Sequence, residues 1–332
     1  MNKKALALLS GGLDSILAVR LIQEQGLEVE AINFLTVFCT CTHRGCQHAA
    51  TKAAQELKIP LRVFNITEEY LDVIKNPKHG YGSNMNPCID CRIFIFRKAK
   101  EYMKEISASF LITGEVLGER PMSQRRDAIL LIEKEAGLKG LILRPLSAKL
   151  FEPTLPEKER IVDRDKLLEI TGRSRKPQIA LAKEFGINDY PCPAGGCLLT
   201  DPQFAKRIKD LLEYNQLTLD NVRLLKFGRH FRLSRNTKLI VGRNEEENIA
   251  LEKQVKSGDI CFKLKDREGP LSILKGAANN DLIKLAASMH SYHTKFRGEA
   301  SLRVEYWGNG QNNCETMPAT VAREAEVEKF RI

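Results

Sequence analysis

The sequence lacks a long apolar run. A membrane-spanning helix needs roughly 20 consecutive apolar residues, and no apolar run in the 332 residues approaches that length. This excludes an integral membrane protein with spanning helices. Residues 5–9 follow two lysines and imitate a secretory signal, but this run is short and leads directly into a glycine-rich turn. We therefore expect a cytoplasmic protein with no membrane partner.

Acidic residues are too few to balance the basic ones. The 52 Lys and Arg residues exceed the 42 Asp and Glu residues, which gives a formal net charge of +10. Such an excess favours a polyanionic partner such as nucleic acid, although an anionic membrane surface would match the same charge. The length leaves room for two domains.

The first glycine-rich turn, Ser10-Gly11-Gly12-Leu13-Asp14-Ser15, lacks the lysine that a Walker loop places before its final Ser or Thr. It lies between an apolar run and a helical pattern, so backbone N–H groups at a helix start can meet an anion. Asp14 would repel a phosphate unless a divalent cation lay between them. The alternative is a tight turn with Asp14 or Ser15 as the helix cap.

The hexapeptide SGGLDS resembles the PP-loop of ATP pyrophosphatases, which split ATP into AMP and pyrophosphate. The later run TGEVLGERPMSQ (residues 113–124), followed by LRPL (143–146), resembles the PP-loop domain of ThiI-type tRNA sulfurtransferases, which make 4-thiouridine. The resemblance implies ATP, with Mg²⁺ positioned by Asp14 and with Arg144 near the phosphates. Together with the strand ends it gives the ATP-binding residues as Ser10, Gly11, Gly12, Leu13, Asp14, Ser15, Phe34, Gly114, Ser123 and Gln124. Without the resemblance, Ser123 and Gln124 would cap a helix and Arg144 would be a surface cation.

Strand-like and helix-like segments alternate through the first 200 residues. Strands are expected at residues 5–9, 28–34, 61–64 and 110–113, and helices at 16–25, 48–57, 91–104 and 177–185. This rhythm predicts an α/β domain with a doubly wound parallel sheet, whose ligands bind at the carboxyl ends of the strands. Residues 149–175 look like an insertion. We expect this domain at 1–200, a linker helix at 201–219, a smaller α+β domain at 220–308 and a polar tail at 309–332.

Seven of the nine cysteines fall in short-spaced groups, which in a cytoplasmic chain indicate metal or redox chemistry. Cys88 and Cys91 stand three residues apart at an expected helix start, where thiolates are stabilised. A glycine-proline loop carries Cys197, with Cys192 as its substitute. Three thiols with an open position favour a site that does chemistry.

The same cysteine arrangement resembles iron-sulfur-dependent tRNA thiolases, in which three cysteines hold a 4Fe–4S cluster whose free iron can hold sulfide. Two alternatives stay open: a dithiol that passes persulfide sulfur through a disulfide, and a zinc site that joins two loops. Another group, Cys39, Cys41, Cys46, His43 and His48, could bind zinc or form a reduced loop beside the nucleotide.

Apolar and basic residues alternate over residues 223–233 and again from 238, which predicts a sheet with one core face and one positive face. We expect Arg229, His230, Arg232 and Arg243 to contact RNA on that face. The strings GRHFRL and IVGRNEEEN resemble the RNA-binding module of NFACT proteins, which would replace the amino-terminal RNA-binding portion of ThiI-type proteins. Otherwise this is a half-buried surface sheet with ordinary cations.

Together these patterns predict an ATP-dependent tRNA sulfurtransferase. It would adenylate a uridine carbonyl oxygen and replace it with sulfur, 4-thiouridine being favoured over 2-thiouridine. We expect Asp14, Cys88, Cys91 and Cys197 to be catalytic, and tRNA and a sulfur donor (sulfide or a persulfide carrier) to be the partners. A homodimer is compatible with the sequence. The alternatives are an amidating PP-loop ligase and a non-catalytic RNA-binding protein.

Overall fold

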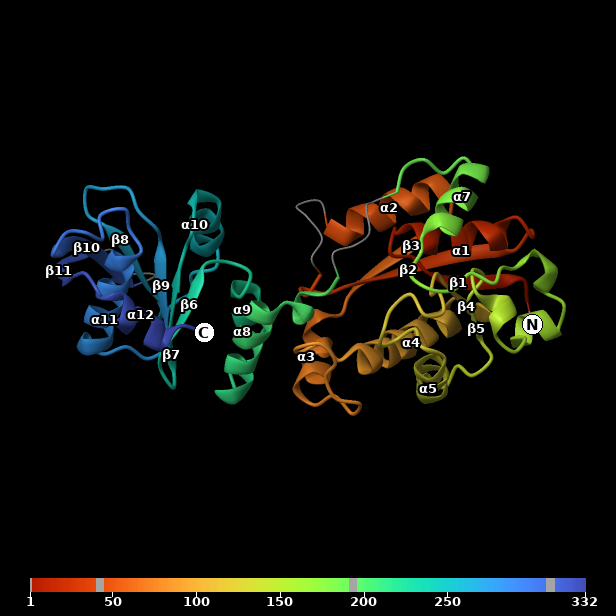
Figure 1. Cartoon of the computed structure of the whole chain (residues 1–332), viewed down its shortest axis with the longest axis horizontal. Coiled ribbons are helices and arrows are strands. Elements are labelled where there is room, and N and C mark those ends of the chain that lie inside the picture. The colour runs from red at the N-terminus through yellow and green to blue at the C-terminus, as the bar shows by residue number, and fades with distance from the viewer. Residues whose placement is uncertain (1, 40–44, 191–195, 309–313) are drawn as a thin grey trace. The chain divides into compact units, whose positions relative to one another are not determined.

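The structure is a computed structural model that describes residues 2–39, 45–190, 196–308 and 314–332, with only the backbone of residues 45–47. The chain forms two compact units, Met1–Thr200 and Asp201–Ile332 (Figure 1). Each is described by itself below. Within the described residues, no helix combines the length and apolar character needed to cross a membrane.

The first unit is built on a parallel sheet with the strand order β3-β2-β1-β4-β5. Its strands are β1 (Lys4–Leu8), β2 (Glu28–Leu35), β3 (Leu61–Asn65), β4 (Phe110–Thr113) and β5 (Ile142–Leu143). The central strand β1 pairs with β2 on one side and β4 on the other. The order of strand addition therefore reverses at β1. This confirms the predicted doubly wound α/β fold, in which ligands bind beyond the carboxyl ends of the strands at the reversal.

Helices cover both faces of this sheet, with α1, α2 and α7 on one face and α4 and α5 on the other (Figure 1). The helices of the unit are α1 (Leu13–Gln23), α2 (Gly45–Leu57), α3 (Thr67–Lys75), α4 (Cys88–Glu105), α5 (Arg126–Ala136), α6 (Leu155–Lys158) and α7 (Lys176–Glu184). Along β1, Ala5 and Ala7 pack with the α1 side, whereas Leu6 packs with Phe96 of α4. Burial on both faces explains why β1 is apolar from its second residue, Ala5, onward.

The segment 149–175, expected as an insertion, packs into the first unit. Val162 and Leu167 are fully buried in the core on the α1 face of the sheet. The backbone N–H of Leu168 also donates to the carbonyl of Pro145, just after β5. The segment therefore brings the start of α7 back to the core.

The second unit contains an antiparallel sheet with the order β11-β10-β8-β9-β7-β6. Its strands are β6 (Arg229–Ser234), β7 (Thr237–Val241), β8 (Ile260–Leu264), β9 (Ser272–Lys275), β10 (Ser301–Gly308) and β11 (Glu315–Thr320). Its helices are α8 (Pro202–Glu213), α9 (Leu219–Leu224), α10 (Glu245–Glu252), α11 (Asn280–Tyr292) and α12 (Glu324–Phe330). The sheet and helices together form the α+β architecture expected for this part.

Two expectations about this unit need correction. Residues 314–332 are no polar tail, because Ala319 of β11 and Val327 of α12 are buried in the core beside α11. Residues 309–313, also assigned to the tail, lie outside the described residues. The helix expected as a linker is α8, which belongs to the second unit. Apolar content alone missed β11 and α12 because each of them fully buries a single small side chain.

Candidate functional site

The glycine-rich turn joins β1 to α1 and leaves the amino end of α1 without a side-chain cap. Ser10 Oγ accepts a hydrogen bond from the Gly12 N–H (3.2 Å), and Ser15 Oγ donates to the Gly12 carbonyl (2.8 Å). The two hydroxyl oxygens lie 3.2 Å apart. The alternative interpretation, in which Asp14 or Ser15 caps the helix, is therefore wrong. The uncapped helix start is suited to an anionic ligand.

Two glycines allow the backbone of this turn to be packed closely. A Cβ on Gly11, which has φ +79°, would lie 2.4 Å from the carbonyl carbon of Ala49 in α2. A Cβ on Gly114, just after β4, would lie 2.5 Å from the backbone of Asp14 and Ser15. The ends of β1 and β4 therefore meet at the start of α1, as the strand-end argument predicts.

The side chain of Asp14 is largely buried, and its Oδ1 has no hydrogen-bond partner among the described residues. Burial raises the pKa of Asp14, whereas Arg175 and Arg120 oppose this shift. Gln178 is fully buried in α7, and its amide lies close enough to Asp14 to oppose the same rise in pKa. An unpaired carboxylate oxygen is a suitable ligand for Mg²⁺.

Sequence reasoning missed Arg120, Arg175 and Gln178. Arg120 stands within the run TGEVLGERPMSQ but was not singled out, and Arg175 was assigned to the insertion. Only the packing of residues 149–175 brings the start of α7 to the glycine-rich turn. One signal for Arg175 is present in the sequence. Arg175 directly precedes Lys176-Pro177, and a proline at this place is typical of a helix start.

The other residues predicted to bind ATP have mixed surroundings. Ser123 and Gln124 are buried, and Gln124 Oε1 accepts from the Arg120 N–H (3.0 Å), which holds the turn that carries Arg120. Phe34 is half-buried beside Phe64. These positions fit a supporting role next to the glycine-rich turn.

Arg144 is not a surface cation, because it is buried between two carboxylates. Its Nε donates to Glu115 Oε2 (3.0 Å), and its Nη1 contacts Glu133. Glu115 also forms an ion pair with Arg92 Nε (3.1 Å), and Arg92 follows Cys91 in α4. A buried ion chain therefore connects the end of β4 to the cysteine-bearing helix. The guanidinium of Arg144 is engaged by protein carboxylates, which argues against a phosphate role.

Three free cysteines, Cys88, Cys91 and Cys197, come together in the first unit. Cys88 and Cys91 lie in the first turn of α4. The loop of Cys197 is fixed beside them, because the Leu198 N–H donates to the Phe38 carbonyl (2.8 Å) and the Leu199 carbonyl accepts from Met85 (3.0 Å). The loop of Cys197 and the start of α4 thus bring the three thiols close together, as predicted.

Burial raises the pKa of all three thiols, to about 12 for Cys197, where Cys91 and Cys88 add to the effect. A hydrogen bond with the buried Tyr70 opposes the shift at Cys91. Desolvation therefore acts against the thiolate stabilisation expected at a helix start. Tyr70 was not anticipated from the sequence.

No group of three or more His, Cys, Asp or Glu side chains among the described residues is arranged to hold a metal ion. The three thiols are neighbours but not a preformed ligand set. Cys39 is disulfide-bonded, and its backbone pairs with Cys197. The substitute ligand Cys192, and the side chains of Cys41, His43 and Cys46, lie outside the described residues.

The residues predicted to contact RNA do not share an exposed face. His230 is 2% exposed, and Arg232 is held by Asp210 of α8 through Nε (2.9 Å) and Nη2 (2.6 Å). The prediction of an open positive face on β6 and β7 is wrong, because α8 and α9 cover it. Arg229 is half-buried at the start of β6, and Arg243 is exposed beside Glu247.

Two family models match the chain, one in each of its two units. Residues 228–331 match the NFACT protein RNA binding domain. Residues 1–179 match the model described as thiamine biosynthesis protein (ThiI), which is more than half of the chain. The chain belongs to the ThiI family. The ThiI match contains Cys88 and Cys91 and ends before Cys197, so the third thiol comes from a segment beyond it.

Similar proteins include a probable tRNA sulfurtransferase of Ureaplasma urealyticum serovar 10, 33% identical over 152 residues that cover 44% of this chain and 37% of that protein. The tRNA-specific 2-thiouridylase MnmA of Syntrophotalea carbinolica is 32% identical over 121 residues, 34% of each chain. The chain spans about a third of the length of these curated relatives. A crystal structure of a 4-thiouridine synthetase–RNA complex with bound ATP is 22% identical, with a TM-score of 0.37, and covers 67% of this chain and 52% of that one.

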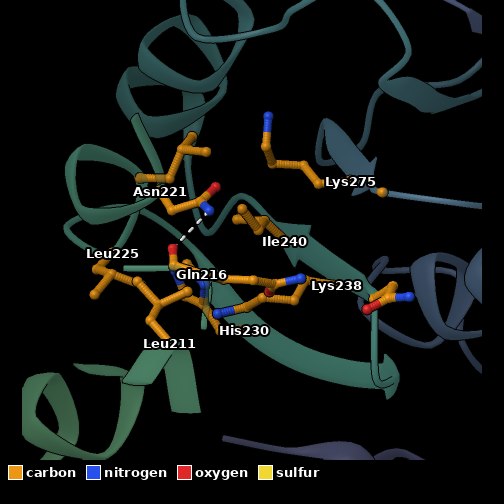
Figure 2. A pocket seen from close by; sticks show the side chains of 11 residues that line it. Leu211, Gln216, Asn221, Leu225, His230, Lys238, Ile240 and Lys275 are labelled. Atoms are coloured by element: carbon orange, nitrogen blue, oxygen red, sulfur yellow. Dashed lines mark hydrogen bonds between the residues drawn. The ribbon is translucent and has the colours of Figure 1, made fainter. Parts of the chain in front are cut away.

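In the second unit of this ThiI-family chain, a cavity of about 140 Å³ lies between α8, α9 and the sheet. Figure 2 shows Gln216, His230 and Lys238 close together, with the Asn221 side chain donating to the Gln216 carbonyl (2.9 Å). Buried Lys238 donates to Asp210 Oδ2 (2.9 Å), the carboxylate that also holds Arg232. One carboxylate therefore fastens two cations of the sheet to α8.

Asp210→Asn should destabilise the second unit by about 3–5 kcal/mol, because Arg232 and Lys238 would lose their shared carboxylate in a buried place. Lys238→Met should cost little, because it leaves a neutral Arg232–Asp210 pair. Burial lowers the pKa of Lys238 from 10.5 to about 8. The free energy of unfolding of the wild-type unit should therefore increase as pH rises between these two values. Lys238→Met should not show this increase. Fluorescence of the single tryptophan, Trp307, measures unfolding of this unit. Equal destabilisation by both substitutions would contradict the assignment.

Proposed function

We propose that this protein is an ATP-dependent tRNA sulfurtransferase that converts a uridine carbonyl to a thiocarbonyl. The observation that carries the proposal is the position of Arg120, which is close enough to affect both Asp14 and Cys88. Burial raises the pKa of each of these groups, and Arg120 opposes both shifts. This position of Arg120 supports a single site that contains both the glycine-rich turn and the thiols, as coupled adenylation and sulfur transfer require.

ATP would bind at the uncapped start of α1, where Ser10, Gly11, Gly12, Leu13 and Ser15 present backbone and hydroxyl groups. Arg120 and Arg175 would neutralise phosphate charge as pyrophosphate leaves. Asp14 would hold Mg²⁺, which when bound screens the phosphates from this carboxylate. The uridine oxygen attacks the α-phosphate of ATP, and the resulting adenylate gives sulfur a good leaving group, AMP.

Cys88, Cys91 and Cys197 would hold a 4Fe–4S cluster, which when bound supplies an iron for inorganic sulfide. The three free thiols fit this donor set, although their unliganded arrangement is not that of a finished metal site. Binding a cation would favour their thiolate forms despite burial. The dithiol and zinc alternatives use the same three residues.

The RNA-binding match of the second unit supports tRNA as the partner, and the names of the relatives, tRNA sulfurtransferase and tRNA-specific 2-thiouridylase, support uridine as the target. The protein incubated with ATP, Mg²⁺, sulfide and unmodified tRNA should release pyrophosphate only when tRNA is present. Mass spectrometry of the nucleosides should then detect a thiouridine and identify its position. Absence of pyrophosphate would favour the non-catalytic RNA-binding alternative, whereas pyrophosphate with an amine adduct would favour the amidating ligase.

Iron and zinc contents separate the three uses of the thiols. Protein purified without oxygen should contain iron and inorganic sulfide and absorb broadly in the visible region. A colourless protein with one zinc per chain would contradict the cluster. A colourless protein free of metal that still transfers persulfide sulfur would favour the dithiol.

A further inference from the structure

Three arginines from distant segments of the second unit lie around His293, and a fourth, Arg243, lies near one of them, Arg229. Arg229 begins β6, Arg243 follows β7, Arg297 follows α11 and Arg331 follows α12. We call them the arginine cluster. Arg229, Arg297 and Arg331 each act electrostatically on His293, and Arg243 and Arg331 act on Arg229. The carboxyl-terminal segment reaches this place because Arg331 pairs with Phe231 of β6.

Aromatic rings hold two members of the arginine cluster in place. The Arg331 guanidinium lies 5.7 Å from the centre of the Phe231 ring, and Arg297 lies 5.8 Å from that of Tyr292. The His293 ring lies between these rings, with its centre 5.3 Å from Phe231 and 5.1 Å from Tyr292. A guanidinium packed on a ring loses less freedom when it binds an anion.

The arginine cluster carries more positive charge than its neighbours neutralise. Arg243 is bound to Glu247, and Arg331 forms a 2.7 Å ion pair with Glu328. Within the described residues, no carboxylate lies within 4.0 Å of the guanidinium of Arg229 or Arg297. The imidazole of His293 adds no charge at neutral pH, since burial lowers its pKa to about 4. Two guanidinium charges are therefore left for an external anion.

We propose that the arginine cluster is the docking surface for the phosphate backbone of folded RNA. This inference rests on the proposed function and names the part of the second unit that holds its tRNA. Arg243, Arg297 and Arg331 are exposed, so they form an open surface for a polyanion rather than an enclosed site for a small ion. All four lie within the residues that match the RNA-binding family model.

The buried rings determine what kind of recognition this surface supports. Phe231 is fully buried, so its ring supports Arg331 and is not available to stack on a base. Planar guanidinium groups bind phosphate oxygens through paired hydrogen bonds. The surface therefore recognises backbone charge and shape, and base identity has little influence on its affinity.

The test compares tRNA affinity of the full chain and its variants between 50 and 300 mM KCl, taken as roughly the range over which phosphate contacts weaken strongly. Arg229→Gln and Arg297→Gln should each weaken binding about tenfold and make the slope of log K against log salt shallower by about one. Arg323→Gln is the matched control. It removes one positive charge from the same unit, at an 86% exposed side chain outside the cluster. Its affinity should change less than about twofold.

Two further measurements keep folding and chemistry separate from docking. Arg229→Lys and Arg297→Lys keep the charge and should retain the wild-type salt slope, which an unfolded unit would not. Wild-type affinity and slope in both glutamine variants would overturn the inference, even if the enzyme still makes thiouridine. Conversely, weakened binding in those variants together with a wild-type protein that releases no pyrophosphate would overturn the proposed function and leave the docking surface standing.

Discussion

Replacing Cys91 by serine should abolish thiouridine formation while tRNA-dependent release of pyrophosphate continues. Cys91 lies in the first turn of α4 with a hydrogen bond to Tyr70, and Cys88 and Cys197 are its neighbours. A serine hydroxyl has nearly the same shape but neither carries transferable sulfur nor binds iron well. The expected loss is on the order of 10³-fold or more in thiouridine yield per pyrophosphate released.

The matched control for this substitution is Cys261→Ser. Cys261 is also a free and buried cysteine, but it lies on β8 in the second unit. Its serine variant should make thiouridine at the wild-type rate if it folds. Thiouridine formation that survives in Cys91→Ser, with ATP consumption unchanged, would remove Cys91 from the sulfur site.

The fold of the first unit was largely predictable because its signals are local. An apolar run, a glycine-rich turn and a helical pattern follow one another at residues 5–9, 10–15 and 16–25, and β1 and α1 lie within two or three residues of these limits. Parallel strands need such a repeating order. The same order placed Ser10 and Gly114 at neighbouring strand ends.

The parts of the site that depend on tertiary packing were not predictable. Alternating cations on β6 and β7 have the same sequence signature whether the polar face meets water or another helix. Here Asp210 of α8 binds Arg232 and Lys238, so the face is closed. In the same way, LRPL does not reveal that Arg144 is enclosed by Glu115 and Glu133. Buried ion pairs join residues that are distant in sequence, and single-sequence patterns do not encode the partner.

These corrections move the expected RNA contacts from a strand face to a strand end. Of the four residues named from the sequence, Arg229 and Arg243 belong to the arginine cluster. Arg232 fastens the sheet to α8, and His230 bonds the Phe227 carbonyl in the loop after α9. The partners that complete the cluster, Arg297 and Arg331, come from outside the alternating pattern. The proposed docking surface therefore includes Arg331, which directly follows α12.

Gly114→Ala should reduce tRNA-dependent pyrophosphate release about 100-fold, because the methyl group would separate the end of β4 from the start of α1. The added Cβ would lie 2.5 Å from backbone atoms of both Asp14 and Ser15. Backbone atoms cannot avoid the contact by a change of rotamer, so the chain itself must shift. The unit should lose about 1–3 kcal/mol of stability, as overpacked sites do.

Gly298→Ala is the control for the general effect of adding a methyl group, since no atom lies within 4 Å of the Cβ it introduces. Thermal unfolding should establish that Gly114→Ala is folded at the assay temperature. ATP binding to the folded variant should weaken in parallel with pyrophosphate release, because the displaced residues are those that carry the nucleotide turn. A Gly114→Ala protein with wild-type ATP affinity and pyrophosphate release would mean that β4 does not position this turn, and the ATP site would have to lie elsewhere.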